Sequence, residues 1–171
     1  MLHVRRVGRG EEFDCLRSEW NALLDPASPH ALFLRHEWFH AWFAAFGAGR
    51  VPAVLVATRG SELHGVLPLC AWTDRFAGLP MARLDLMANG HSPMADLVAR
   101  PGSEAAVADA FASHLAEAGN WDLAVLPEVG AGASLTQLAA RFPSHTRLVQ
   151  PQREAPYIPV SGDWESFRGS L

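Results

Sequence analysis

Two histidines on a predicted helix are the first residues whose types and spacing could do chemistry. His36 and His40 flank Glu37 in the pattern H-E-x-x-H, and side chains at i and i+4 of a helix face the same way. Such a pair can ligate zinc while the glutamate acts as a general base, which makes a zinc hydrolase one candidate function. A catalytic zinc needs a third protein ligand, and the distant candidate Glu62 lies in a predicted hairpin turn. We therefore expect no metal here and interpret the segment as a Trp-rich packing helix.

A polar stretch inside an otherwise apolar region supplies further acid–base candidates. Residues 89–96 carry His91, Ser92 and Asp96 on a loop that contains Asn-Gly and Ser-Pro pairs, and such loops often carry ligand contacts. We take His91 and Asp96 as candidate catalytic residues and expect the stretch to line a groove. Glu128, which follows a predicted strand, is the third candidate and could act as a base. Ser92 lacks the elbow motif of a serine nucleophile, so the alternative to a Ser–His–Asp triad is a turn with Asp96 bonded locally.

Two glycine-rich segments resemble phosphate-binding loops. Residues 5–10 fit the pattern R-x-x-G-x-G, and residues 130–135 approach the dinucleotide fingerprint. A phosphate would meet free N–H groups at the start of the following helix, but Glu11 and Glu12 occupy the first turn after residues 5–10 and would repel it. A simple turn and helix cap is the alternative that we favour for both segments.

The elements that must position these residues follow from hydrophobic periodicity and turn residues. Helices are predicted at residues 11–24, 34–46, 104–118 and 134–142, with a further helix start at 161–163. Strands are predicted at residues 2–7, 51–58, 63–72, 121–126, 146–149 and 157–160, and a strand at 83–88 and 94–99 is interrupted by the polar loop. Pro52 and Pro68 must each lie at a sheet edge or a bulge. Strands grouped between helices imply an α+β domain with a largely antiparallel sheet.

Composition excludes several classes of protein. The chain has 171 residues, 49% of them apolar, and a net charge of −4, which is typical of one folded domain and excludes disorder. An acidic balance without a basic stripe argues against a nucleic-acid partner. The apolar runs are too short to span a membrane, and no secretory signal is present. Cys15 and Cys70 make no disulfide framework, so we expect a cytoplasmic protein.

Spaced aromatic and turn residues along nearly the whole chain resemble those of one acyltransferase family. The matching segments are Trp20-Asn21-Ala22-Leu23, Ser28-Pro29, Phe33-Leu34, Trp38…Trp42…Phe46-Gly47, Arg59-Gly60…Leu63…Gly65…Pro68-Leu69, Asn89-Gly90-His91-Ser92…Asp96 and Pro156-Tyr157-Ile158…Trp164…Phe167. In these segments the chain is similar to the opening of CelD-like acetyltransferases, which are related to the FemAB-like acyltransferases. The resemblance implies that residues 1–171 form a single domain with the GNAT fold: α+β, with a mixed, mostly antiparallel sheet flanked by helices.

The resemblance also implies a function, which is acyl transfer from acetyl-CoA or another acyl-CoA to an amine-type acceptor. Family members resemble two GNAT-like halves and bind acyl-CoA mainly in the C-terminal half. In this chain residues 99–104 stand where the family's pyrophosphate loop would lie, but they depart from its pattern, and Glu104 adds a negative charge. The family's tyrosine acid has no counterpart, since Tyr157 is the single tyrosine. We therefore expect this domain to contribute the acceptor site, with a self-sufficient acetyltransferase that uses Glu128 or His91 as base as the alternative.

The same resemblance sets the expected partners. The acceptor would be a small molecule, a peptide or a saccharide, and a C-terminal GNAT half would follow in a longer protein. Trp164, Phe167 and Leu171 begin an apolar stripe on a short predicted helix, which is too short to be stable alone in water. Because exposed apolar faces usually find another surface, we expect a homodimer.

Overall fold

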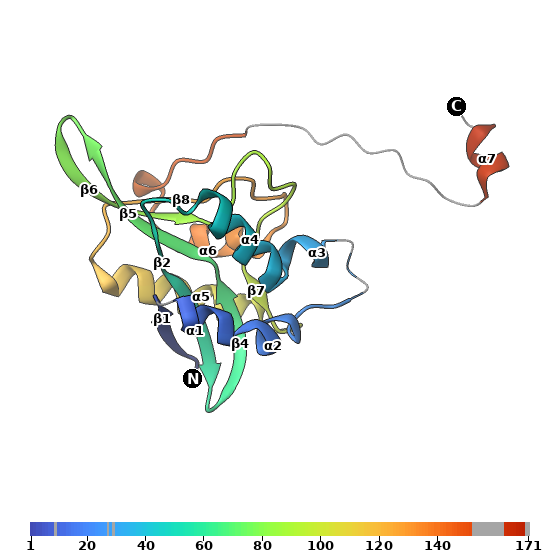
Figure 1. Ribbon diagram of the computed structural model, residues 1–171, viewed down its shortest axis with the longest axis horizontal. Helices are drawn as coiled ribbons and strands as arrows, with labels where there is room; N and C mark the ends of the chain where they lie inside the picture. Colours follow the sequence, from blue (N-terminus) through green and yellow to red (C-terminus); the bar gives the residue numbers. More distant parts are fainter. Residues whose placement is uncertain (9, 27, 29, 152–162, 170–171) are drawn as a thin grey trace.

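Two four-stranded β-sheets lie between two groups of helices in the computed structural model, which describes residues 1–8, 10–26, 28, 30–151 and 163–169 (Figure 1). The first sheet has the order β1-β3-β4-β7 and the second the order β2-β5-β6-β8. Every named strand pair is antiparallel except β6 and β8, which are parallel. The strands are β1 (His3–Val7), β2 (Val51–Pro52), β3 (Val54–Arg59), β4 (Glu62–Leu67), β5 (Leu69–Phe76), β6 (Leu79–Leu86), β7 (Val98–Ala99) and β8 (Leu123–Val125).

The helices fall into two groups by the side of the sheets that they cover. The first group comprises α1 (Gly10–Cys15), α2 (Arg17–Asn21), α3 (Ala31–Leu34) and α4 (His36–Phe46), and the second comprises α5 (Glu104–Ala118) and α6 (Ser134–Ala140). A 3₁₀ turn at Ser144–Thr146 and α7 (Trp164–Arg168) follow. The predicted α+β class, with a mixed and mostly antiparallel sheet flanked by helices, is confirmed. Among the described residues, no helix has both the length and the apolar character that crossing a membrane requires.

Alternation along the strands creates one hydrophobic cluster on each side of the sheets. In β3, Val54 and Val56 join the cluster under α1, α2 and α4, whereas Leu55 and Ala57 join the cluster under α5 and α6. Successive side chains of a strand point to opposite faces, so a continuous apolar run is buried on both sides. The largest fully buried side chains are Trp20 and Phe39 in one cluster and Phe111 in the other.

A close approach of β4 to α5 depends on a glycine. A side chain at Gly65 would clash with the Val107 side chain of α5, because an added Cβ would overlap its methyl groups. Gly65 thereby lets the 15-residue helix α5 lie directly on the first sheet. This packing fixes the start of α5 next to β7, and both line the candidate site described below.

The two N-terminal helices differ from their predicted bounds because of local backbone breaks. The predicted helix at residues 11–24 is divided at Leu16 into α1 and α2 and ends at Asn21. The predicted helix at residues 34–46 begins at His36, because Arg35 has an extended backbone with ψ 151°. Gly47 follows the last helical residue as predicted. By contrast, the helix predicted at residues 104–118 has those bounds in the structure.

The central strands follow the proline and turn signals. Pro52 lies on the edge strand β2, as predicted, whereas Pro68 divides the predicted strand at 63–72 into β4 and β5, which belong to different sheets. The predicted strand interrupted by the polar loop corresponds to β6 before the loop and β7 after it, but β6 begins at Leu79 rather than at residue 83 and β7 is limited to Val98–Ala99. The strand predicted to end at Trp72 was too short: β5 continues to Phe76, and the turn at Ala77 and Gly78, both with positive φ, leads into β6. The hairpin extends beyond the helices (Figure 1).

The last predicted strands are not confirmed. Residues 146–149 form no strand and are largely exposed, and residues 157–160 lie outside the described part of the chain. The predicted helix start is confirmed by Asp163, whose side chain accepts a hydrogen bond from the Ser166 N–H at the start of α7.

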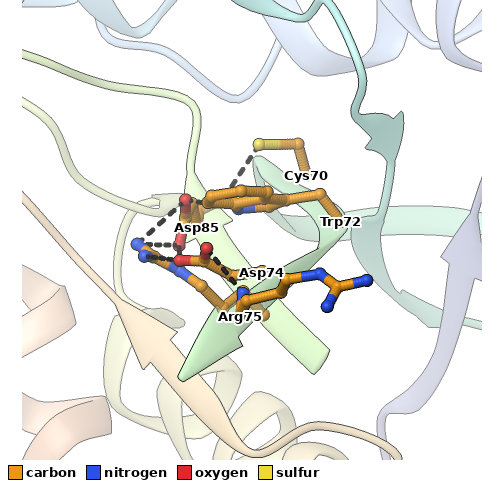
Figure 2. A network of polar contacts seen from close by, with 6 residues as sticks. Cys70, Trp72, Asp74, Arg75 and Asp85 are labelled. Atoms are coloured by element: carbon orange, nitrogen blue, oxygen red, sulfur yellow. Dashed lines mark hydrogen bonds and ion pairs between the residues drawn. The ribbon is translucent and has the colours of Figure 1, made fainter. Parts of the chain in front are cut away.

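A polar network holds the β5–β6 hairpin where it leaves the apolar core (Figure 2). Asp85 accepts hydrogen bonds from the Trp72 indole N–H at 2.8 Å and from Arg83 at 3.0 Å. Arg83 also reaches Asp74 at 2.8 Å and stacks over the Trp72 ring. Trp72 therefore belongs to a partly exposed polar cluster, in contrast to the fully buried Trp20 of the core.

Candidate functional site

A cavity of about 190 Å³ opens beside β7, the edge strand of the first sheet. We call it the β7 pocket. It joins the end of α2 and the start of α3 to the start of α5 and the start of α6. Its lining residues are Leu23, Leu24, Asp25, Ser28, Ala31, Leu34, Leu97, Val98, Ala99, Pro101, Glu104 and Ser134. Elements from both helical groups therefore meet at this one edge of the sheet.

The polar groups of the β7 pocket are acids and hydroxyls. Asp25 and Glu104 carry carboxylates, Ser28 and Ser134 carry hydroxyls, and the other lining residues are apolar. None of the lining residues is basic. A pocket of this composition attracts a cation and repels an anion.

The loop between β7 and α5 tests whether acyl-CoA fits here. A phosphate-binding loop offers free backbone N–H groups and a cation. The Gly102 N–H donates instead to the Glu104 carboxylate at 3.1 Å, and Arg100 forms an ion pair with Glu62 of β4 at 2.7 Å. The Glu104 carboxylate thus occupies the place that a bound anion would take, and the nearby cation, Arg100, is paired with Glu62. The residues present do not fit the diphosphate of an acyl-CoA.

Asp96 attaches the start of α6 to the segment that leads into β7. Its carboxylate accepts backbone N–H groups from Ser134 at 2.8 Å, from Leu135 at 2.9 Å and from the adjacent Leu97 at 2.8 Å. Burial raises the pKa of Asp96, although the three N–H donors oppose that rise. Asp96 borders the β7 pocket through Leu97 and Ser134. Its carboxylate is thus engaged by backbone groups, of which only the Leu97 N–H is local in sequence, as the alternative of a locally bonded Asp96 had supposed.

Glu128 follows β8 in a conformation that is rare for residues other than glycine. Its φ is 58°, and its carbonyl oxygen accepts the Ala95 N–H at 3.0 Å. Ala95 and Val129 form an isolated parallel bridge. Non-glycine residues held in the left-handed region cost about 1–3 kcal/mol and concentrate at functional sites. Glu128 is thereby placed next to the segment that carries Asp96.

His91 lies apart from the other two candidates. It is exposed, and its ring stacks on Phe46 at the end of α4 with 5.6 Å between centroids. Ser92 is buried, and its hydroxyl accepts the Asn89 N–H at 3.3 Å. Within the described residues, no hydrogen bond joins His91 to Ser92, Asp96 or Glu128. The structure therefore does not assemble the triad considered from composition, and neither of the two cavities described here is lined by residues 89–96.

The H-E-x-x-H residues each have a structural partner. The buried His36 donates from Nε2 to the Phe13 carbonyl at 2.9 Å, and burial lowers the pKa of its ring. His40 lies 3.3 Å from an Asp14 carboxylate oxygen. The described residues contain no group of three His, Cys, Asp or Glu side chains placed to hold a metal ion. Glu62, the distant ligand candidate at the start of β4, forms an ion pair with Arg100 instead.

Glu37, the middle acid of that motif, faces an open depression between α1, α2 and α4. This depression of about 540 Å³ is lined by Asp14, Cys15, Arg17, Ser18, Asn21, Arg35 and Glu37. Asn21 donates to both carboxylate oxygens of Glu37, and Arg17 donates at 2.9 Å. Chiefly because of the Asn21 hydrogen bonds, the pKa of Glu37 falls from 4.5 to about 2. A carboxylate held ionised in this way ties α2 to α4 and is poorly suited to act as a base.

The two glycine-rich segments also have structural partners. Arg5 and Arg6 lie within β1, where the strand pairs with β3, and Arg9 lies outside the described residues. The segment at residues 130–135 leads into α6, whose first N–H groups are bound by Asp96. Helix capping thus accounts for the second segment, with the cap supplied from a distant part of the sequence.

Sequence reasoning missed most of the β7 pocket. Asp25 and Ser28 read as residues that end a helix, and Ser134 reads as a helix start. Asp25 and Ser28 share one turn between α2 and α3, whereas Ser134 begins α6, and only the packing of both helical groups against β7 brings them together. Glu104 was the exception, because a carboxylate in the first turn of the predicted helix already indicated that phosphate would bind poorly there.

Comparison with known proteins assigns no family. No protein-family model and no curated protein matches the chain. Among solved structures, a transcriptional regulator from Bacillus halodurans C-125 is 11% identical, covers 94% of this chain and 100% of its own, and has a TM-score of 0.47. A GNAT family acetyltransferase from Staphylococcus aureus subsp. aureus USA300_TCH1516 is 9% identical over 92% of this chain and 98% of its own, with a TM-score of 0.40. A ribosomal-protein-alanine N-acetyltransferase from Brucella melitensis biovar Abortus 2308 is 13% identical over 94% and 100%, with a TM-score of 0.39.

Proposed function

We propose that this chain serves acyl transfer to an amine and that its β7 pocket holds the amine-bearing acceptor. The observation that carries the proposal is the pairing of two carboxylates, Asp25 and Glu104, with no basic residue in the lining of a pocket. An amine acceptor is a cation near neutral pH, and a carboxylate-lined pocket binds it through charge-assisted hydrogen bonds. The acyl-transfer part of the proposal rests on the family resemblance of the sequence. The order of helices and strands agrees with that resemblance.

The loop before α5 supports the division of labour in this proposal. The Glu104 carboxylate takes the Gly102 N–H, so the diphosphate of an acyl-CoA would meet a negative charge at the start of α5. The acyl donor would then be held outside this pocket. The carboxylates that exclude the diphosphate are the same groups that favour an ammonium ion.

Calorimetric titration tests the proposal with two probes, acetyl-CoA and the small diamine putrescine. We expect putrescine to bind the wild-type chain at least fivefold more tightly than it binds the Asp25→Asn or Glu104→Gln variant. Glu104→Gln keeps an oxygen that can accept the Gly102 N–H, so it removes charge with little change of shape. Glu117→Gln, at the exposed far end of α5, is the matched control and should bind like the wild type.

Acetyl-CoA should bind this chain no more tightly than millimolar. A micromolar dissociation constant for acetyl-CoA would overturn the proposal, and so would putrescine binding that ignores both carboxylates.

The second candidate function is a self-sufficient acetyltransferase in which Glu128 acts as the base. The left-handed backbone of Glu128, at the end of the one parallel strand pair among the named strands, favours this alternative. Glu128 would take the proton from the acceptor's ammonium group. Micromolar binding of acetyl-CoA together with turnover that Glu128→Gln abolishes would establish this candidate. His91→Ala would test His91, the other candidate base.

A further inference from the structure

Strand β1 forms one outer edge of the first sheet, at the opposite end from the β7 pocket. The strand order β1-β3-β4-β7 makes β1 and β7 the two edge strands, and β3 is the neighbour with which β1 pairs. His3, Arg5 and Arg6 are exposed, whereas the Val4 side chain packs against the cluster under α5. We call the outward side of this strand the β1 edge.

Hydrogen bonding along β3 determines which backbone groups of that strand are directed toward β1. The Ala53 N–H donates to the Leu69 carbonyl at 2.8 Å. Leu55, two residues later, is opposite β4, so it directs its groups to the same side as Ala53. In an antiparallel ladder, successive residues of a central strand bond to opposite neighbours. Val54 and Val56 therefore bond to β1.

The same alternation leaves four backbone groups of β1 directed outward. Arg5 is opposite Val56 and therefore bonds to β3. Val4 and Arg6, the residues on either side of Arg5, direct their N–H and C=O groups away from the sheet. Among the described residues, no hydrogen bond occupies these four groups. The β1 edge can thus continue the ladder with another strand.

The β1 edge is positively charged although the chain is acidic overall, with a net charge of −4. Arg5 and Arg6 are successive residues and lie on opposite faces of the strand, so an added strand would meet one guanidinium group on each face. In the part of the chain that the structure describes, neither of them forms an ion pair. By contrast, Arg17 and Arg35 both pair with Glu37.

This charge selects among the chains that could pair with the β1 edge. Charged side chains on an edge strand normally prevent indiscriminate pairing. A second copy, in the register that pairs all of β1, would place Arg5 opposite its own copy, and like charges directly opposite each other destabilise a sheet. An acidic strand would instead place carboxylates opposite Arg5 or Arg6. A nucleic acid has the negative charge but lacks N–H and C=O groups at strand spacing.

We propose that the β1 edge accepts an extended, acidic peptide segment of a partner protein as an added strand. The N–H and C=O groups of Val4 and Arg6 supply the main-chain hydrogen bonds, and the guanidinium groups of Arg5 and Arg6 select acidic side chains, as in other cases of strand addition. The inference goes beyond the proposed function, because the β1 edge and the β7 pocket have no residue in common.

Fluorescence polarisation with end-capped hexapeptides that carry an uncharged fluorophore tests the inference. The first probe alternates valine and glutamate, the second replaces glutamate by lysine, and the third is the glutamate peptide with its four central amides N-methylated. We expect the lysine and N-methylated peptides to bind at least tenfold more weakly than the glutamate peptide. Equal binding of the glutamate and N-methylated peptides would overturn strand addition.

Substitutions in β1 separate the contribution of charge from that of the main chain. Arg5→Gln and Arg6→Gln each remove one charge and should each weaken binding of the glutamate peptide at least threefold. Arg147→Gln, at an exposed arginine outside the sheets, is the control and should bind like the wild type. Arg6→Pro also removes the outward N–H, and proline is tolerated at such edge positions. It should bind at least threefold more weakly than Arg6→Gln; if it does not fold, the N-methylated peptide decides the question.

Three further outcomes would also overturn the inference. The first is no binding of the glutamate peptide up to 1 mM. The second is a single-stranded thymidine hexanucleotide that displaces the peptide and binds more tightly, which would indicate a nucleic-acid surface. The third is dimerisation that Arg6→Pro abolishes, which would show that a second copy of the chain covers the β1 edge. The putrescine titration does not involve β1, so failure here leaves the proposed function standing.

Discussion

The Asp96 carboxylate accepts the Ser134 backbone N–H at 2.8 Å, although the two residues are 38 positions apart. Asp96 thus supplies to α6 the capping group that the preceding residue, Ala133, lacks. Because Ser134 and the residue after Asp96 both line the β7 pocket, this bond fixes one wall of the candidate site.

Removal of that cap should loosen α6 before the rest of the molecule. Asp96→Ala leaves the N–H groups of Ser134 and Leu135 without their acceptor, which we expect to cost about 1–2 kcal/mol of the free energy of unfolding. Amide hydrogen exchange should show faster exchange in α6 than in α5. Asp109→Ala, which removes an exposed ion pair with Arg141, is the control and should cost less than about 1 kcal/mol. Equal costs for both variants would contradict the capping role.

Glu37 should make stability depend on pH in the acid range. Its pKa is about 2 in the folded chain, so the ionised form stabilises the fold fully above about 4.5, and this contribution is lost as the pH falls from 4.5 towards 2. Because 38% of the side chain is exposed, we expect Glu37→Gln to cost only about 1 kcal/mol at pH 7. Urea unfolding at several pH values checks this: the cost should shrink as the pH falls below 4.5. A cost that is the same at pH 3 and pH 7 would contradict it.

The two cysteines should differ in reactivity. Burial raises the pKa of the Cys70 thiol to about 11, so roughly a thousandth of it is thiolate at pH 8, whereas Cys15 is exposed. Iodoacetamide at pH 8 should label the native chain once, at Cys15, and the unfolded chain twice. Mass spectrometry of the wild type and of Cys15→Ser distinguishes the two sites. Rapid labelling of native Cys70 would show that the β5–β6 hairpin opens readily.

The close approach of β4 to α5 gives a stability prediction in which a second substitution should partly offset the effect of the first. Gly65→Ala places a Cβ against Val107, and we expect a loss of about 1–3 kcal/mol from overpacking. Val107→Ala alone leaves a cavity and also destabilises. The double variant should lose less than the sum of the two single losses by at least about 0.5 kcal/mol. Gly10→Ala, where an added Cβ meets nothing within 4 Å, serves as the control; additive losses in the pair would be evidence against the contact.

Association through α7 remains a prediction. Trp164 is 65% exposed, and its ring lies 5.8 Å from that of Phe167; Leu171, the third residue of the predicted stripe, lies outside the described residues. We expect light scattering to report a homodimer whose dissociation constant rises at least fivefold in Trp164→Ala. An 18.6 kDa monomer at every concentration would refute this prediction.

The sequence predicts the elements best where local signals agree. The helix at 104–118 has an apolar stripe and a serine before its first residue, and its bounds are those of α5. The helix at 11–24 has a stripe of equal quality, but the structure divides it at Leu16, whose N–H bonds to the Phe13 carbonyl three residues back, and periodicity does not reveal this division. The predicted strand ended at Trp72, whereas β5 continues past it into a polar stretch in which Asp74 pairs with Arg83 on the opposite strand.

The candidate site was harder to predict than the fold. Asp96 and Glu128 were singled out individually, and backbone contacts place their segments side by side. His91 was singled out by the same reasoning, but its ring stacks on Phe46 at the end of α4. Asp25 and Ser134 reach the β7 pocket only through contacts between distant segments, for which a single sequence carries no local signal.

The loop between β6 and β7 leaves the second sheet and enters the first. Leu86 is opposite Leu69 of β5, and Val98 is opposite Val66 of β4, so the two ends of the excursion are anchored to neighbouring strands that only Pro68 separates. The tip, Asn89 to Pro93, adds no rung to the ladder. The length and sequence of this tip could therefore change during evolution without loss of the fold. A recognition loop from another protein could also be grafted there, provided that Ala95 and Asp96 are kept.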